Sequence, residues 1–358
     1  MVFRLTMNQS SEGDALMLDW GPPGSGLRAV IDLGRTADYT ALRPALMADP
    51  QVALFVISHV DADHIEGAMP MLKEPTAPFT PVDVWFNGHD HLAAAKARAL
   101  VLEALSVGQG EKLSAGIRKF GWPWNAAFGG GPVSTGSPEA AAPIALVGGL
   151  SVRLLSPSDA ALAKLEPEWN ALLAKSSLLI GQPDQAPLQP KDLESLSILN
   201  VDALAAERYA EDSTVPNGTC IAFLAEFGAK RVLLGADAHP RQIEQALAAL
   251  GYGPQNRVRL DLFKLCHHGS KANLSPALLT MIDCTRFAIS TDGSRHNHPD
   301  PQTIARILKA DPSRPKTFYF NTRQEHAEQW DRADLRAKWA YTCVFPDPPA
   351  TAGLTIEV

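Results

Sequence analysis

The chain has 358 residues, of which 46% are hydrophobic and 20% are charged, and this composition is typical of a globular protein with a substantial core. The formal net charge is −7, whereas a nucleic-acid-binding protein usually carries a basic excess or a basic patch. Any nucleic-acid substrate would therefore have to be held by local cations, by metals or by a partner subunit.

Several features favour a cytoplasmic protein that does not enter a membrane. No stretch approaches the roughly 20 uninterrupted apolar residues of a membrane helix. Residues 8–14 are polar where a signal peptide needs an apolar run. The four cysteines form no CxxC pair, and we expect them to be reduced thiols.

The first ninety residues alternate between short apolar runs and helical patterns. Residues 52–58 (VALFVIS) form a continuous apolar run, which is typical of a strand buried on both faces. The other elements expected in this part are strands at 15–18, 28–33 and 82–86 and helices at 39–48 and 65–72.

The middle of the chain, at about residues 92–200, is interpreted as a helical and loop insertion and not as a separate domain. Residues 91–120 and 159–179 carry helical patterns, and residues 150–155 read as a strand between them. Residues 182–190 are rich in Pro and Gln and predict a mobile surface loop.

Strand patterns return after the insertion and alternate with helices. The expected strands are 221–224, 231–234, 262–265 and 286–290, and the expected helices are 241–250, 276–281 and 301–309. Runs of strands with helices in both halves predict an α/β (α+β) fold, an αββα sandwich that forms one domain over residues 1–358.

The strongest chemical signal is the segment SHVDADH at residues 58–64, directly after the buried strand. It holds four potential metal ligands, His59, Asp61, Asp63 and His64, within six residues. A strand end delivers side chains to one rim, and histidine nitrogen and aspartate oxygen are common metal ligands. A solvated polar loop is the alternative, but it would rarely alternate these residue types so closely.

Three later strands also end in ligand-type residues. Asp237 follows the strand at 231–234, the pair His267 and His268 follows 262–265, and His298 lies in a polar loop after 286–290. Each signal is weak alone, but four such strand ends form a constellation. Two metals could share a bridging carboxylate and activate a water between them.

These motifs resemble the metallo-β-lactamase superfamily, over about residues 12–90 and 215–305. The matching positions are Asp32 at the end of a strand, the HxHxDH-like motif at residues 59–64, Asp237 as the bridging aspartate and His268 before a glycine. The sequence is more closely similar to the nuclease domain of ComEC-type DNA-uptake proteins and their stand-alone relatives. The features shared with that group are a GDA turn at 13–15, HxDxDH, a segment near Asn217, HHGS at 267–270 and a late NHP segment at 297–299.

The resemblance implies a ligand set for two divalent metal ions. One metal would take His59, Asp61 and the bridging Asp237, and the other would take Asp63, His64, His268 and the same Asp237. Asp32 would orient a ligand imidazole or the loop that carries it. Asp61 replaces the usual histidine, and Asn217 is the nearest candidate where the third motif has histidine. The site is therefore rich in oxygen, which favours Mn²⁺ at least as much as Zn²⁺.

The predicted catalytic residues are Asp63, His267 and His298. The two histidines could contact the substrate or protonate a leaving oxygen, although His298 could also be a structural turn residue before Pro299. Further candidates for substrate contact are Asn217, Lys264, Ser270 and Lys271. A solvated surface position is the alternative for each lysine.

Other residues leave two interpretations open. His89 and His91 in the GHDH segment look like metal ligands but could lie in a surface loop. Trp122 and Trp124 could stack on bases or pack in the core.

Three functions remain open from the sequence. The first is a two-metal phosphodiesterase or nuclease acting on DNA, in a genome-defence role beside a protein partner. The second is a hydrolase of a small ester, lactone or thioester on the same fold, which the acidic net charge favours. The third is a binding module with an inert site, against which the intact ligand set argues.

Overall fold

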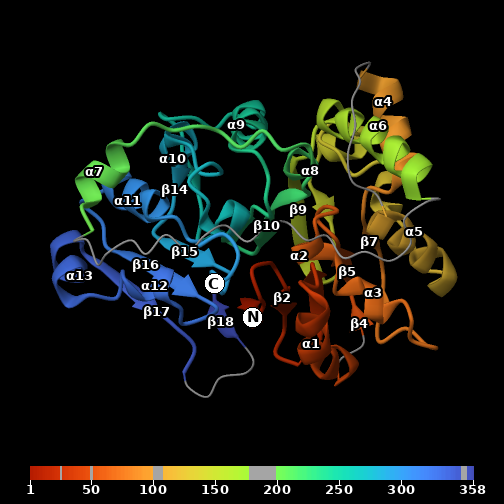
Figure 1. Cartoon of the computed structure of the whole chain (residues 1–358), viewed down its shortest axis with the longest axis horizontal. Helices are drawn as coiled ribbons and strands as arrows, with labels where there is room; N and C mark the ends of the chain where they lie inside the picture. Colours follow the sequence, from red (N-terminus) through yellow and green to blue (C-terminus); the bar gives the residue numbers. More distant parts are fainter. Residues whose placement is uncertain (25, 49–50, 100–107, 177–198, 348–352) are drawn as a thin grey trace.

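Two β-sheets pack face to face, and helices cover their outer faces (Figure 1). This arrangement comes from a computed structural model that describes residues 1–24, 26–48, 51–99, 108–176, 199–347 and 353–358. The predicted fold class, an α/β (α+β) sandwich, is confirmed. In the described residues, no helix is long and apolar enough to cross a membrane.

The first sheet has six strands and joins the two ends of the chain. Its order is β18 (Leu354–Glu357), β1 (Val2–Met7), β2 (Leu16–Gly21), β3 (Leu27–Ile31), β5 (Leu54–Val56) and β7 (Val84–Trp85). Strand β1 pairs antiparallel with both β18 and β2, so the two termini lie close together (Figure 1). Strands β3, β5 and β7 run parallel.

The second sheet has eight strands. Its order is β17 (Tyr341–Val344), β16 (Lys316–Phe320), β15 (Arg286–Ile289), β13 (Leu262–Lys264), β11 (Lys230–Leu234), β10 (Ala222–Phe227), β9 (Leu150–Ser156) and β8 (Ile144–Ala145). In this sheet, β11, β13, β15, β16 and β17 are neighbours in that order and run parallel to one another. Two small two-stranded pairs accompany the sheets, β4 (Gln51–Val52) with β6 (Thr80–Pro81) and β12 (Val258–Arg259) with β14 (Ile282–Asp283).

The helices divide by the sheet they cover. Those packed on the first sheet are α1 (Thr36–Ala48), α2 (Ala62–Ile65), α3 (Ala68–Met71), α4 (His89–Ala99), α5 (Gly108–Phe120) and α6 (Asp159–Ser176). Those packed on the second sheet are α7 (Val201–Ala206), α9 (Pro240–Ala249), α10 (Pro276–Met281), α11 (Pro301–Ala310), α12 (Glu325–Glu328) and α13 (Ala333–Trp339). The short helix α8 (Val215–Gly218) precedes β10.

Alternation along the strands produces these layers. In β10, Phe223 and Ala225 belong to the core cluster between the sheets, whereas Ala222 and Leu224 face the outer helices. In β5, Val56 points to the space between the sheets and Phe55 to the helices. Because both faces are covered, the two strands are apolar apart from Glu226 in β10, and the run at residues 52–58 predicts such a strand for β5.

The middle of the chain, expected to be a helical and loop insertion, contains helices and also two strands of the second sheet. Helices α4, α5 and α6 lie within or next to residues 92–200, but β8 and β9 also fall there, and β9 pairs with β10 inside the second sheet. Strand β9 corresponds to the strand expected at residues 150–155. The loop expected at residues 182–190 lies outside the described residues.

Candidate metal centre

Three strand ends from both sheets converge at one place. The loop after β5, in the first sheet, carries His59 to His64, and α2 begins within it. The second sheet contributes Asp237 after β11 and His268 in a short 3₁₀ turn, η4 (Cys266–Gly269), after β13. A hydrogen bond from the backbone nitrogen of Ile221 to the carbonyl of Ser58 joins the two sheets here, at 2.9 Å.

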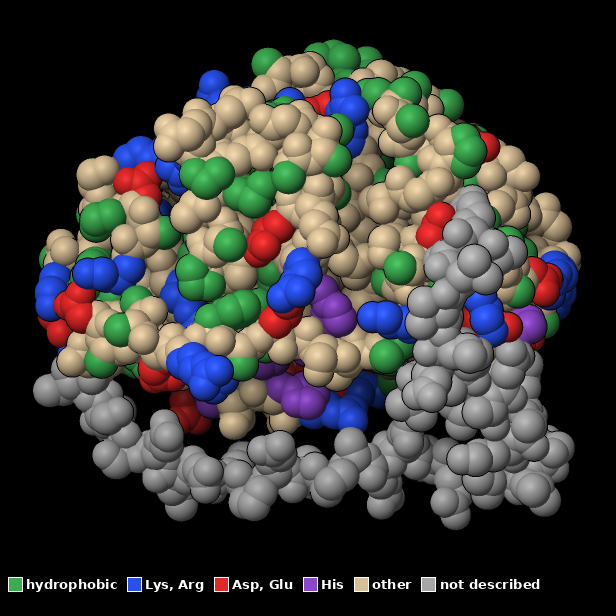
Figure 2. All heavy atoms as spheres, turned by 90° about the horizontal axis from the view of Figure 1, so that it is seen from above, with side chains coloured by type: hydrophobic (Ala, Val, Ile, Leu, Met, Phe, Trp, Pro, Cys, Tyr) green, Lys and Arg blue, Asp and Glu red, His purple; other side chains and the backbone are tan. Residues whose placement is uncertain are grey.

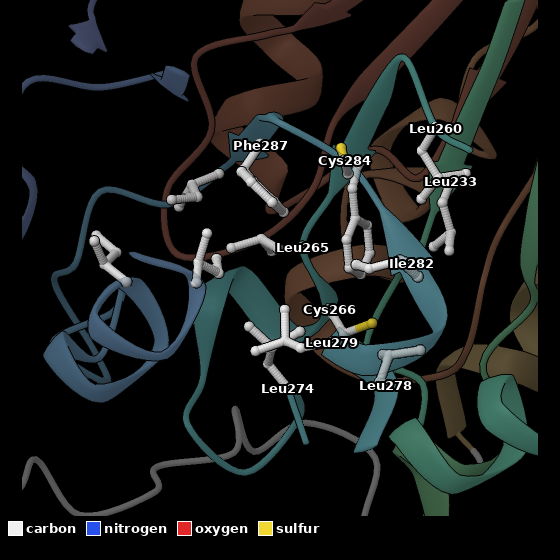
Figure 3. Close-up of a cluster of buried hydrophobic side chains, with 14 of the residues drawn as sticks. Leu233, Leu260, Leu265, Cys266, Leu274, Leu278, Leu279, Ile282, Cys284 and Phe287 are labelled. Atoms are coloured by element: carbon white, nitrogen blue, oxygen red, sulfur yellow. The ribbon is translucent and has the colours of Figure 1, made fainter. Parts of the chain in front are cut away.

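The packing behind η4 fixes the two histidines that follow β13. Leu265 and Cys266 point into a buried cluster with Leu274, Leu278 and Leu279 (Figure 3). Both His267 and His268 have positive φ angles, of 45° and 53°. Such angles are uncommon for residues other than glycine. The apolar anchor therefore holds a turn that presents both rings to the centre.

Four ligand atoms lie close enough to hold one metal ion. They belong to Asp63, His64, Asp237 and His268, and all lie within 4.8 Å of one another. The Asp237 Oδ1 atom lies 3.4 Å from His64 Nε2 and 3.5 Å from His268 Nε2. Asp63 Oδ2 lies 3.7 Å and 3.4 Å from the same two nitrogens. This is the ligand set that the resemblance implies for one of the two metals.

The imidazole rings of His64 and His268 form their hydrogen bonds through Nδ1, and their Nε2 atoms face the centre. His64 Nδ1 lies 2.7 Å from the Asp32 carboxylate, and His268 Nδ1 lies 2.9 Å from the Ser290 carbonyl. Both acceptors call for a proton on Nδ1, so in the neutral ring each Nε2 atom keeps its lone pair for a metal ion. In the described residues these Nε2 atoms and Asp237 Oδ1 are buried without a hydrogen-bond partner. Buried polar atoms are rarely left unpaired, and a metal ion would satisfy all three.

Electrostatics also favours a cation here. Burial by itself would lower the pKa of His64 and His268, but the surrounding carboxylates, Asp237 first, raise both well above 6.5. Burial would likewise raise the pKa of Asp237, but His267, His268 and His64 lower it well below 3.8. The centre thus stabilises positive charge, whether carried by protons or by a divalent ion.

The remaining predicted ligands lie beside this group. The centroid of the His59 ring is 4.3 Å from that of the His64 ring, and the His59 side chain is fully buried. Its Nε2 atom also has no hydrogen-bond partner in the part of the chain that the structure describes. That nitrogen lies 3.5 Å from Asp61 Oδ2, whose side chain is 38% exposed. The structure therefore places His59 beside Asp61, next to the four-residue group.

His267 is held by a polar network that sequence reasoning missed. The Asn273 amide nitrogen donates to Asp212 Oδ2 and to the Asp237 carbonyl, both at 3.1 Å, so its Oδ1 faces His267 Nδ1 at 3.0 Å. Asn217 donates to the same Asp212 oxygen at 2.7 Å. His267 Nε2 is then free and lies 3.6 Å from Asp237 Oδ2. Asn217 was expected to be a weak ligand or substrate contact, and its own Oδ1 is buried with no hydrogen-bond partner among the described residues.

An N-terminal turn at residues 12–14 reaches into the centre. Asp14 forms a fully buried ion pair with Lys264 at 2.7 Å and lies 3.6 Å from His268 Nδ1. The expected phosphate contact by Lys264 is therefore wrong, because its ammonium group is buried and also donates to the Leu265 carbonyl. A Cβ atom on Gly13 would lie 1.8 Å from the Asp63 carbonyl oxygen, so only glycine allows this close approach.

The outer side of the centre carries the other candidates. His298 is buried beside His267, with ring centroids 5.5 Å apart, and burial together with His267 lowers its pKa well below 6.5. Ser270 is buried and accepts a bond from the Ala272 backbone, whereas Lys271 is exposed. Lys271 therefore remains available to a substrate, whereas the Ser270 hydroxyl is used in the turn at residues 270–272.

The structure also places His91, Trp122 and Trp124, for which the sequence left two interpretations open. His91 lies in α4, is 6% exposed and accepts a bond from the Gly88 backbone nitrogen, so the surface-loop interpretation is wrong for it. Trp122 is buried against Phe55 and Phe79, which agrees with core packing. Trp124 donates to the Phe86 carbonyl and stacks on the Phe86 ring.

Asp14, Asp212 and Asn273 contact the residues of the centre, but the sequence predicted no role for them. Asp14 was visible in the GDA turn, but its partner lies 250 residues away in the chain. Asp212 precedes Asn217 by five residues in the chain. That closeness to a predicted substrate contact was the available sequence signal for Asp212.

Comparison with known proteins adds no identification. No family model matches the sequence, and a search of curated proteins found no significant match. The description of the centre therefore rests on its own residues, and the likeness to metallo-β-lactamase-type nucleases stays a prediction.

Proposed function

We propose that this chain is a hydrolase that uses two divalent metal ions to cleave phosphodiester bonds in nucleic acid. The observation that carries the proposal is the group of facing, buried and unpaired ligand atoms on His64, Asp237 and His268, with Asp63 beside them. The HxDxDH and HHGS motifs support the choice of phosphodiester, and the three carboxylates among the proposed ligands favour Mn²⁺.

The residues divide into holding and reacting roles. Asp63, His64, His268 and Asp237 would hold one ion, and His59 and Asp61 would hold a second ion that shares Asp237. When bound, such a pair lowers the pKa of a water between the ions and offsets the charge of the phosphate. Asp32 and the Ser290 carbonyl keep the protons of His64 and His268 on Nδ1.

His267 is the group best suited to move a proton. Burial alone would lower its pKa, but Asp237 and Asp212 raise it above 6.5, and its Nδ1 proton is committed to Asn273. Its Nε2 atom can therefore carry a second proton and donate it to a leaving oxygen. His298, whose pKa is lowered, contributes a neutral ring next to it.

The test is direct. Protein loaded with Mn²⁺ is incubated with single-stranded DNA, duplex DNA and RNA, with and without Zn²⁺ in place of Mn²⁺. Asp63→Asn is the matched control, because it keeps the side-chain shape and removes the charge. We expect cleavage by the unaltered chain and its loss in the variant.

A second candidate is hydrolysis of a small ester, lactone or thioester, which the net charge of −7 favours. On the face shown in Figure 2, basic and acidic side chains are interspersed, which is compatible with a small substrate. Turnover of a lactone or thioester by a chain that cuts no nucleic acid would replace the nuclease proposal with this one. A genome-defence role beside a protein partner is a further proposal, tested by co-purification from the native host.

A further inference from the structure

The exposed edge of the metal centre carries a short basic loop, residues 293–297, which we call the rim loop. It lies between β15 and α11, in the segment GSRHN. Arg295 is partly exposed, with 32% of its side chain accessible, and His296 is exposed. Neither residue has a part in the metal ligation or proton transfer described above.

The rim loop is anchored on both sides, so its tip has a defined position. Before it, the Asp292 backbone nitrogen donates to the Ser11 carbonyl at 2.9 Å. After it, Gln324 donates to the His298 carbonyl at 2.9 Å, and the Asp300 backbone nitrogen donates to the Gly269 carbonyl at 3.1 Å. The last of these bonds ties the loop to the turn that carries His268.

Ring contacts connect the tip to the centre. His296 stacks on His298 with centroids 5.8 Å apart, and His298 lies 5.5 Å from His267. His267 Nε2 in turn faces Asp237. His296 is thus two ring contacts away from the atom that faces the proposed bridging carboxylate.

Arg295 is held loosely. Its Nη1 atom lies 3.4 Å from Glu12 Oε1, whereas Arg35 Nη2 lies 2.5 Å from the same oxygen. Arg35 also pairs with Glu66 at 2.7 Å, so its charge is shared between two carboxylates. A guanidinium has five N–H donors, and among the described residues Arg295 has this one long contact, which leaves donors for another anion.

We propose that Arg295 and His296 bind a phosphate of a polynucleotide strand next to the phosphate that is cleaved. Arg295 supplies charge and paired donors, and His296 supplies a ring N–H. The inference rests on the proposed nuclease function and deepens it, because it makes the preferred substrate a strand with more than one phosphate. It also answers how a chain of net charge −7 holds a polyanion, namely through a local cation at the rim.

The test compares two substrates in the Mn²⁺-loaded full chain, a short single-stranded DNA and bis(p-nitrophenyl) phosphate, which has one phosphate only. In the double variant Arg295→Ala, His296→Ala we expect the ratio of kcat/KM for DNA to kcat/KM for the small diester to fall about tenfold or more, through KM for DNA. We also expect the slope of log KM for DNA against log salt concentration to fall by about 1, because the variant no longer neutralises one phosphate. Arg295→Lys keeps the charge and should retain most of that slope.

Arg332→Ala is the matched control, because Arg332 is exposed, pairs with Asp334 and lies next to α13, at the far left of Figure 1. It should leave both the ratio and the salt slope unchanged. A double variant with the unaltered ratio and slope overturns the inference and leaves the nuclease proposal intact, as does an equal loss on both substrates. If the unaltered chain cuts neither substrate, the nuclease proposal itself fails.

Discussion

The Asp32 carboxylate lies 2.7 Å from Nδ1 of His64, and this contact decides which nitrogen of the ring faces the metal centre. Both side chains are completely buried. Asp32 also accepts bonds from the backbone nitrogen and the hydroxyl of Ser58, each at 2.7 Å. One carboxylate therefore orients the ligand ring and the start of the loop that carries it, as carboxylates behind metal-bound histidines commonly do.

Replacing Asp32 by Asn tests this orienting role. The φ angle at Asp32 is 57°, a value that Asn tolerates well, so the backbone should persist. We expect Mn²⁺ affinity to fall by about 10- to 100-fold, because the Nδ1 proton loses its charged acceptor. Isothermal titration calorimetry measures the affinity, and circular dichroism checks the fold. Affinity equal to that of the unaltered chain would mean that Asp32 serves only the loop.

Asp237→Asn tests the shared carboxylate. Asp237 Oδ1 faces both His64 Nε2 and His268 Nε2, and Oδ2 faces His267. We expect close to two metal equivalents in the unaltered chain by elemental analysis, and loss of both in the variant. Asp61→Asn, at the 38% exposed partner of His59, should lose one equivalent at most. Saturation of the unaltered chain at one equivalent would remove the two-metal proposal.

Gly13→Ala tests the close approach of the N-terminal turn. The new Cβ atom would lie 1.8 Å from the Asp63 carbonyl oxygen, so either the turn or the Asp63 loop must move. We expect weaker Mn²⁺ binding, since a shifted Asp63 no longer faces His268. Gly253→Ala is the matched control, because a Cβ atom there meets nothing within 4 Å. Equal metal affinity in the two variants would show that the turn yields without disturbing the centre.

The buried pair of Asp14 and Lys264 predicts a stability effect. Both side chains are at most 1% exposed, and Lys264→Met would strand the Asp14 carboxylate in the core. We expect the free energy of unfolding to fall by about 3–5 kcal/mol. Adding Asp14→Asn should restore part of that loss, because the second change removes the unpaired charge. Urea unfolding of the two single variants and the double variant measures the coupling, and simple additivity would contradict it.

His91 predicts a loss of stability in acid. Burial is the main reason that its pKa is lowered from 6.5 to about 4, so the folded chain stays neutral at this ring where the unfolded chain takes up a proton. The stabilisation that comes from the neutral ring is complete above pH 6.5 and is lost as the pH falls to about 4. We expect this loss to lower the free energy of unfolding by about 3 kcal/mol.

The control for this effect is His91→Gln, which keeps an acceptor for the Gly88 backbone nitrogen but does not titrate. The slope of unfolding free energy against pH should be smaller in the variant between pH 4 and 6.5. Parallel curves for the two proteins would show that the ring titrates normally.

Local patterns were sufficient for the central elements. The apolar runs that predict strands at 28–33, 231–234, 262–265 and 286–290 correspond to β3, β11, β13 and β15. Burial on both faces leaves such strands few polar positions, so their apolar runs can be recognised in the sequence without knowledge of the neighbouring strand. The outer strands β1, β16, β17 and β18 were not predicted. Strand β1 alternates between buried and partly buried residues, and β18 reaches it from the other end of the chain.

The sequence alone determined which residue types stand at the strand ends, and hence that Asp63, His64, Asp237 and His268 could meet. Tertiary structure decided the protonation, charge and exposure of the side chains around these four ligands. The sequence predicts that Lys264 contacts a phosphate, but in the folded chain Lys264 lies opposite Asp14 and is its buried counter-ion. The state of His267 likewise depends on Asn273 and Asp212, which no spacing rule connects to it. Ligand type is a local property, whereas the proton, charge and exposure of a side chain depend on the groups that folding places around it.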